Sequence, residues 1–84
     1  MKLIFDEQVW SDYQYWIKTD KKILKRINLL IRNIQRTPFK GIGDPEPLKY
    51  NWSGFWSRRI TKEHRLVYAV KSNSILIAQC RFHY

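Results

Sequence analysis

Cysteine is almost absent from this chain of 84 residues, which contains only Cys80. A single thiol excludes an internal disulfide and suits the reducing cytoplasm, where we expect the protein to act. Its position in a strand-like run favours a small buried hydrophobic side chain over a reactive thiol. Long apolar runs are also missing: none approaches the roughly 20 residues of a membrane-spanning helix, and the amino-terminal residues do not resemble a signal peptide.

Acidic residues are scarce as well. Seven acids stand against sixteen Lys and Arg, which gives a formal net charge of +9. This balance favours a nucleic acid, an anionic membrane surface or an acidic protein as partner. The few carboxylates argue against a two-metal nuclease, and His64, Cys80 and His83 lack the spacing of metal ligands. The nucleophile elbow of a serine hydrolase is missing too, so we expect neither metal nor cofactor.

The first half of the chain predicts a helical hairpin after a short strand at residues 2–5. Asp6 is a plausible N-cap, and apolar residues then recur at helical spacing. Thr19 and Asp20 separate this helix from a second one, which Pro38 ends. The predicted apolar stripes are Val9, Trp10, Tyr13, Trp16 and Ile17 in the first helix, and Ile23, Leu24, Ile27, Leu30, Ile31 and Ile34 in the second.

The second half predicts a meander of antiparallel strands. Residues 37–47 hold all three prolines and form a loop, after which the apolar period changes to two. We expect strands at residues 48–50, 55–60, 65–70 and 75–83. The expected fold is an α+β domain spanning residues 1–84, with the helical hairpin packed on a mostly antiparallel, twisted sheet of four to five strands.

Alternation along these strands predicts a concentrated anion site. Side chains of successive residues point to opposite faces of a sheet. We expect the helices to cover Leu76, Ala78, Cys80 and Phe82, which leaves the alternate residues of this strand on the open face: Ile75, Ile77, Gln79, Arg81 and His83. The predicted open-face group consists of Arg59, Arg65, Arg81 and His83, with Lys49 nearby on an edge strand. Arg58 interrupts the alternation, and the sequence gives no reason for it.

A nuclease would also need a base, and the loop offers Glu46 between Pro45 and Pro47. The following proline favours extended backbone, which would let this carboxylate project toward the site. The alternative is an ordinary solvent-facing loop carboxylate. With a base present, the residues suit metal-free RNA cleavage, in which the 2′-hydroxyl attacks the adjacent phosphorus and His83 protonates the leaving oxygen.

Four segments of the chain resemble one known family. They are residues 41–49 (GIGDPEPLK), 53–60 (SGFWSRRI), 63–68 (EHRLVY) and 80–84 (CRFHY), and they carry the resemblance along the whole length. The chain is similar to the YoeB-type toxins of YefM–YoeB toxin–antitoxin systems, within the RelE/ParE-like superfamily. The resemblance implies a microbial-RNase-like fold that cleaves messenger RNA in the ribosomal A site and so inhibits translation.

The resemblance also assigns roles to residues. It implies Glu46 as general base, Arg65 as the residue that stabilises the phosphate, and His83 as general acid. Tyr84, Lys49 and Arg59 match positions that bind or orient RNA. It does not assign Tyr50 or Trp52, for which core packing and stacking on a base are both open.

The implied partners are the bacterial ribosome with its messenger RNA and an acidic, partly disordered antitoxin that disturbs the toxin's terminus. Such complexes repress their own promoter, with DNA contacts made mainly by the antitoxin, and toxins of this type also form homodimers. The basic side of the second helix, with Lys21, Lys22 and Lys25, is either a solvated surface or a contact for ribosomal RNA. Two other functions remain open: a non-catalytic RNA- or ribosome-binding module, and a ParE-like gyrase poison.

Overall fold

The computed structural model describes residues 1–83, which form two helices and a five-stranded sheet. The elements, in chain order, are β1 (Lys2–Phe5), α1 (Glu7–Thr19), α2 (Lys21–Arg36), β2 (Glu46–Pro47), the 3₁₀ turn η1 (Tyr50–Trp52), β3 (Trp56–Arg59), β4 (Arg65–Lys71) and β5 (Ser74–Gln79). The strand order is β1-β5-β4-β3-β2, and only the β1–β5 pair is parallel. The expected α+β fold is confirmed.

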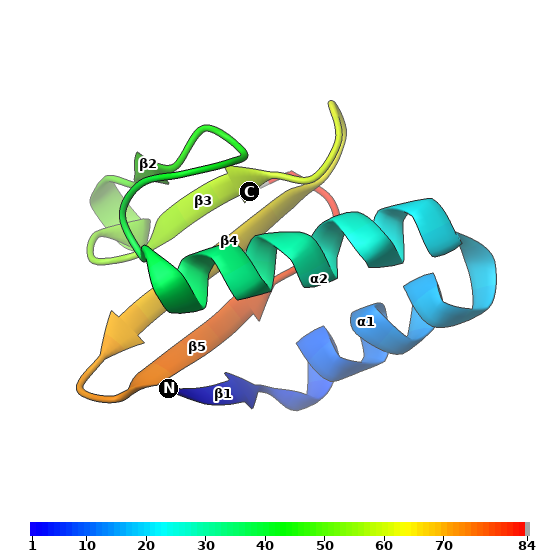
Figure 1. The fold of residues 1–84 in the computed structure, drawn as a ribbon, viewed down its shortest axis with the longest axis horizontal. Coiled ribbons are helices and arrows are strands. Elements are labelled where there is room, and N and C mark those ends of the chain that lie inside the picture. The colour runs from blue at the N-terminus through cyan, green and yellow to red at the C-terminus, as the bar shows by residue number, and fades with distance from the viewer. Residues whose placement is uncertain (84) are drawn as a thin grey trace.

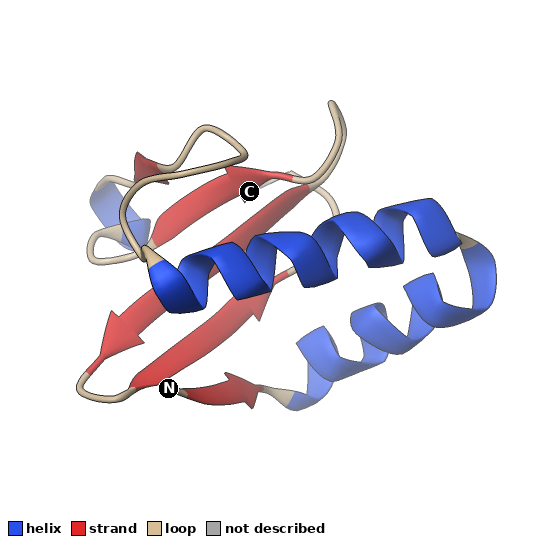
Figure 2. Cartoon of the chain, viewed as in Figure 1, coloured by secondary structure: helices blue, strands red, loops and turns tan. Residues whose placement is uncertain are grey.

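Two aspartates define the helical hairpin, as predicted. The Asp6 carboxylate accepts a hydrogen bond from the Val9 amide, which caps α1. Asp20 accepts from the amides of Lys22 and Ile23 and caps α2. Each carboxylate satisfies amides that the first helical turn leaves without a partner. Both helices lie on one side of the sheet, and α2 crosses it diagonally (Figures 1 and 2).

The core lies between these helices and the sheet. The predicted stripe of α2 is confirmed, because Ile27, Leu30 and Ile34 are completely buried. The stripe of α1 is only partly confirmed: Val9 and Trp16 are buried, whereas Trp10 is 49% exposed. Burial of such a continuous apolar surface is the main stabilising contribution in a chain of this size. No helix within residues 1–83 is both long and apolar enough to cross a bilayer.

The predicted faces of the last strand are wrong at its beginning. Ile75 and Ile77, expected on the open face, are completely buried in the helix-side core. The register explains this, since Tyr68 pairs with Ile77 but Val67 pairs with Gln79, so Ala78 is an extra residue in the ladder. A bulge of this kind reverses the alternation. Beyond the bulge Cys80 is in the core as predicted, but Phe82, which was also expected on the helix side, is 58% exposed because β5 has already ended.

Two predicted strands have different limits. Residues 48–50 were expected to be a strand, but the edge strand β2 is Glu46–Pro47, and Tyr50 already begins a 3₁₀ turn. Glu46 pairs there with Ser57, and Pro47 with Trp56. The last strand ends at Gln79 rather than His83, so the terminal residues leave the sheet.

Candidate functional site

A small hollow of about 250 Å³ lies at the β3 side of the sheet. Its lining residues are Asp44, Glu46, Ser57, Arg59, Arg65 and His83. They come from the proline-rich loop, three strands and the terminal segment. Four of the six were singled out from the sequence: Glu46, Arg59, Arg65 and His83. The expected gathering of a carboxylate, two guanidinium groups and an imidazole is therefore present.

Backbone pairing to β3 positions Glu46. Glu46 stands opposite Ser57 in the β2–β3 ladder, so its main chain is held at the sheet edge. Just before it, the Arg59 amide donates to the Gly43 carbonyl at 2.7 Å. Gly43 has a φ of +81°, and a Cβ there would lie 2.8 Å from Leu30 Cδ2. The loop thus approaches α2 too closely for a residue with a side chain.

Arg58 holds the preceding part of the loop and has no exposed surface. Its guanidinium donates to Asn33 Oδ1 at 2.6 Å and to the Tyr68 hydroxyl at 3.1 Å. Further donations go to loop carbonyl oxygens, namely those of Thr37 (2.8 Å), Ile42 (2.9 Å), Lys40 (3.1 Å) and Pro38 (3.4 Å). Arg58 interrupts the apolar pattern because its buried guanidinium donates to the carbonyl oxygens of an irregular loop, which has no helix or sheet hydrogen bonds of its own there.

Arg59 and Arg65 are directly opposite each other in the β3–β4 ladder. Like charges in such a cross-strand pair destabilise a sheet unless an anion lies between or beside them. Within the protein, Arg59 Nη1 lies 3.7 Å from Asp44 Oδ2, with both side chains largely exposed. Arg65 Nη1 donates to the Thr61 carbonyl at 2.8 Å, which fixes its direction. The pair is suited to bind a phosphate.

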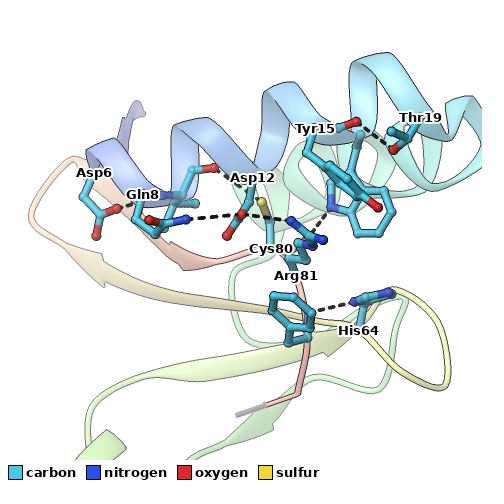
Figure 3. Close-up of polar contacts among 11 residues, drawn as sticks. Asp6, Gln8, Asp12, Tyr15, Thr19, His64, Cys80 and Arg81 are labelled. Atoms are coloured by element: carbon cyan, nitrogen blue, oxygen red, sulfur yellow. Dashed lines mark hydrogen bonds and ion pairs between the residues drawn. The ribbon is translucent and has the colours of Figure 1, made fainter.

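Hydrogen bonds hold the terminal segment that carries His83 to α1, to β4 and to the turn before β4. Trp16 Nε1 of α1 donates to the Cys80 carbonyl at 2.9 Å. The Arg65 amide donates to the Phe82 carbonyl at 2.9 Å, and the Phe82 amide donates to His64 Nδ1 at 2.7 Å (Figure 3). His64 must therefore be unprotonated at Nδ1. These bonds bring His83 to the hollow although β5 has already ended.

The prediction that Arg81 lies on the open face beside Arg65 is wrong. Arg81 does not line the hollow and instead packs against α1 (Figure 3). Its guanidinium carbon lies 3.7 Å from the centroid of the Tyr15 ring, and its Nη1 lies 3.6 Å from Asp12 Oδ1. The bulge at Ala78 and the end of β5 turn the side chain toward the helix. There, charge pairing and a cation–π contact hold it.

Two predicted supporting residues lie elsewhere. Lys49 lines a neighbouring hollow that shares Glu46 with the first one. It is exposed and directly precedes η1. Tyr84 lies outside the residues that the structure describes.

Three residues at or beside the site received no role from the sequence. Asp44 and Ser57 line the hollow, and His64 holds the terminal segment. Ser57 is two residues before Arg59 in the same strand, so alternation puts both side chains on one face. Asp44 is two residues before Glu46 in the same loop. The sequence therefore contained a signal for both residues. His64 carried no such signal, because the whole β4–β5 hairpin separates it from Phe82 in the chain.

A metal centre is not supported by the described residues, among which no group of three His, Cys, Asp or Glu side chains could hold an ion. Cys80 is completely buried, as predicted. Burial, with a smaller contribution from the Asp12 charge, raises the pKa of its thiol to about 12. The carboxylates, guanidinium groups and imidazole that line the hollow are groups that can transfer protons and stabilise negative charge.

Comparison with known proteins gives consistent matches over the whole chain. A family model described as the YoeB-like toxin of bacterial type II toxin–antitoxin systems matches residues 5–84. Toxin YoeB of Escherichia coli K12 is 67% identical over 84 residues, which is 100% of each chain.

Solved structures agree with the sequence matches. A YoeB/ParE toxin from Agrobacterium tumefaciens superposes with a TM-score of 0.98 at 52% identity, covering 100% of each chain. The YoeB–YefM complex from Staphylococcus aureus gives 0.93 at 47% identity, covering 100% of this chain and 98% of that one. A YoeB dimer from the same organism gives 0.93 at 48% identity with the same coverage.

Proposed function

The chain belongs to the YoeB-like toxins of bacterial type II toxin–antitoxin systems, and from this premise we propose that it is a ribosome-dependent endoribonuclease. It cleaves messenger RNA in the ribosomal A site and thereby stops translation. The observation that carries the proposal is that Glu46, Arg65 and His83 line one hollow together with Arg59. A carboxylate, cations and an imidazole in one place are the groups that metal-free RNA cleavage requires.

In the proposed reaction, Glu46 accepts the proton of the RNA 2′-hydroxyl. The 2′-oxygen then forms a bond to the adjacent phosphorus, and the bond from phosphorus to the 5′-oxygen breaks. Arg65 and Arg59 stabilise the additional negative charge on the phosphate oxygens. His83 gives a proton to the departing 5′-oxygen, so the products are a 2′,3′-cyclic phosphate and a 5′-hydroxyl.

The two proton-transfer roles follow from the chemistry of the groups. A carboxylate is an acceptor of protons, and Glu46 is a carboxylate in the lining of the hollow. Histidine can carry a proton near neutral pH and release it to a developing alkoxide. The hydrogen bonds that fix Phe82 also fix the position from which His83 acts.

The remaining family residues support this reaction in different ways. We propose that Lys49 contacts RNA beside the hollow and that Tyr84 orients the substrate. Arg81 does not belong to the catalytic group, because its contacts with Asp12 and Tyr15 are directed at α1. Its proposed role is to hold the terminal segment in place.

The proposed partners are the ribosome with its message and an acidic, YefM-like antitoxin. An S. aureus relative was solved as a YoeB–YefM complex and also as a dimer, which supports an antitoxin and a homodimer for this chain. An antitoxin that displaces residues 80–84 would remove His83 from the hollow. Contact with operator DNA is proposed only through the antitoxin complex, and the proposed location is the cytoplasm.

Primer extension on a translated message tests the function. The wild-type protein should produce cleavage inside codons that occupy the A site, and Glu46→Ala and His83→Ala should each lower the rate by about 100-fold or more, the usual contribution of acid–base catalysis. Glu63→Ala is the matched control, since Glu63 is an exposed carboxylate that does not line the hollow.

The alternatives would give other results. Parental cleavage by both variants would contradict the assigned roles. Ribosome binding without any cleavage would leave a non-catalytic binding module, and DNA breakage by gyrase in the protein's presence would indicate a gyrase poison.

A further inference from the structure

A second, larger hollow of about 720 Å³ opens beside the candidate catalytic one. It is lined by the continuous segment of residues 46–52, and Glu46 lines both hollows. A polynucleotide whose scissile phosphate occupies the first hollow would have a neighbouring nucleotide at the second. Lys49 in this segment has a proposed role in RNA binding, whereas Tyr50 and Trp52 have no role in the proposed reaction.

Tyr50 is presented to solvent in an unusual way. It is 91% exposed, and its backbone has a φ of +58°. A bulky residue in this left-handed region is strained by about 1–3 kcal/mol, and strain of this kind tends to persist at functional sites. An exposed ring regains none of that energy through core packing, which argues against a structural role for Tyr50.

The segment that carries Tyr50 is nonetheless well held. The Trp52 amide donates to the Lys49 carbonyl at 3.1 Å, and the Ser53 amide donates to the Tyr50 carbonyl at 3.0 Å. At its start, the Leu48 amide donates to the Phe55 carbonyl at 2.9 Å. The ring of Tyr50 therefore projects from a fixed backbone, which reduces the entropy lost when a ligand binds.

The other lining residues complete a site for a nucleotide. Trp52 is partly buried and packs edge-to-face against Phe55, with ring centroids 5.3 Å apart, so its indole is fixed. Lys49 adds an exposed cation to the same hollow. Aromatic rings with an adjacent cation are the usual means of binding single-stranded nucleic acid, because every base has a face that can stack.

We propose that this hollow is a nucleobase subsite: the base next to the cleaved phosphate stacks on Tyr50, with Trp52 forming the wall and Lys49 contacting the backbone phosphate. The inference rests on the proposed function and deepens it, since it adds a specificity site for single-stranded RNA to the catalytic hollow. A base bound in the second hollow would then keep the nucleotide that is cleaved beside Glu46.

Fluorescence of a short oligoribonucleotide that contains 2-aminopurine tests the subsite directly. In the His83→Ala background, which should not cleave the probe, binding should quench the fluorescence through stacking. Tyr50→Ala should weaken binding by roughly tenfold and restore the fluorescence, the effect expected for one stacked base. Tyr50→Phe should behave like the parent, because stacking needs the ring and not the hydroxyl.

Trp10→Ala is the matched control, because Trp10 is an exposed aromatic residue on α1, 49% exposed, that does not line this hollow. It should leave binding and quenching unchanged. Tyr50 is so exposed that its removal should not affect folding, which a thermal melt of each variant will verify. Absence of quenching by the parent, or equal quenching by Tyr50→Ala, would overturn the subsite.

A kinetic measurement separates this proposal from the proposed function. On programmed ribosomes, Tyr50→Ala should raise KM more than it lowers kcat and should weaken the preference for particular bases beside the cut. If Tyr50→Ala cleaves with the KM, kcat and base preference of the parent, the subsite is contradicted and the nuclease function is not. Quenching that depends on Tyr50, in a protein that never cleaves, would uphold the subsite and overturn the nuclease. Loss of antitoxin affinity alone would show that the surface binds protein instead, and would also overturn it.

Discussion

Backbone strain in this protein is concentrated around the two hollows. Of the four non-glycine residues with positive φ among residues 1–83, Asp44, Tyr50 and Phe82 line or adjoin them, and only Ser72 lies in a distant hairpin turn. Such conformations cost free energy and persist when the surrounding structure enforces them. Here hydrogen bonds to Arg59 of β3, to Arg65 of β4 and to His64 hold the backbone around Asp44 and Phe82, and the bonds of the η1 turn hold Tyr50. Hydrogen bonds thus fix the backbone of these residues beside the hollows.

Cys80 illustrates a residue whose chemistry is suppressed by its position. It is completely buried in the helix-side core, and its Sγ lies 3.6 Å from the Val9 carbonyl oxygen. The pKa of its thiol is raised from 9.0 to about 12, mainly by burial. The folded protein therefore keeps the proton at pH values where the unfolded chain has lost it.

The stability of the protein should consequently fall at alkaline pH in a way that depends on Cys80. A raised pKa in the folded state stabilises the protein fully below the unfolded pKa, and this contribution is lost as the pH rises toward the folded value. Between pH 9 and 10 the wild type should lose about 1 kcal/mol more unfolding free energy than Cys80→Ala. Urea denaturation at both pH values measures the difference. Parallel pH dependence of the two proteins would contradict the assignment.

At the scale of elements, the loop between α2 and β2 is the part on which the site depends most. Residues 37–42 have no regular secondary structure, and Arg58 and Asn33 satisfy their polar groups. The Tyr68 hydroxyl adds a donation to the Pro38 carbonyl at 2.6 Å. Burial raises the pKa of that hydroxyl, so it stays a donor well into the alkaline range. This clamp fixes the loop that leads to Glu46, whose own backbone pairs with Ser57.

Weakening the clamp should impair both stability and cleavage. Arg58→Met would leave several partly buried acceptors and the buried Tyr68 hydroxyl without this donor, and should cost about 3–5 kcal/mol of unfolding free energy. Asn33→Ala removes one acceptor of Arg58 and should cost about 1–3 kcal/mol. The milder variant should also lower kcat for messenger RNA cleavage while KM changes little, because Glu46 moves and the binding arginines stay.

Gln35→Ala is the control for this pair, since Gln35 lies on the same helix but toward β1. It should change neither thermal stability nor kcat appreciably. An Asn33→Ala protein with wild-type kcat would show that the loop positions Glu46 without this clamp.

The elements also indicate how far sequence reasoning extends. The helix caps at Asp6 and Asp20 were predictable because capping depends on a few neighbouring residues. The faces of β5 were not, because the bulge at Ala78 arises from pairing with β4 and leaves no clear mark in the pattern. Arg58 was seen as an anomaly, but its partners are loop and helix residues that only the fold brings near.

At the scale of the whole molecule, positive charge extends from the hollow onto α2. Arg26 of α2 donates to the Arg59 carbonyl at 3.1 Å, which joins the helix to the catalytic strand. Lys21, Lys22 and Lys25 lie exposed in the first turns of α2, on the N-terminal side of Arg26. We propose that this surface contacts ribosomal RNA while the hollow engages the message.

Replacing Lys21, Lys22 and Lys25 with Gln should weaken ribosome binding and reduce its dependence on salt. Each lost phosphate contact lowers the slope of log affinity against log salt by about 0.7–0.9. The triple variant should therefore reduce the slope by roughly 2–3 while leaving thermal stability intact. Filter binding to ribosomes over a range of salt concentrations measures it.

A triple variant of the exposed Lys2, Lys40 and Lys71 lowers the formal charge equally, from +9 to +6, and serves as the control. Equal effects of the two variants would mean that net charge alone matters. Unchanged affinity in both would leave α2 with a simply solvated basic surface.

The site as a whole was partly predictable. The gathering of Glu46, Arg59, Arg65 and His83 followed from strand alternation and the proline-bracketed loop, and the family resemblance assigned their roles. Arg81 was misplaced because the chain leaves the sheet at Gln79 and turns toward Asp12. Contacts between distant segments, such as that of His64 with Phe82, required the structure.

The most direct test of the proposed acid and base uses ribosomes programmed with a message that carries sulfur in place of the bridging 5′-oxygen at the cleavage position. A thiolate leaves without protonation, so loss of the general acid should no longer matter. His83→Ala should cleave this message at nearly the wild-type rate, although it cleaves the ordinary message slowly. Glu46→Ala should remain slow on both messages. Rescue of Glu46→Ala, or failure to rescue His83→Ala, would contradict the account.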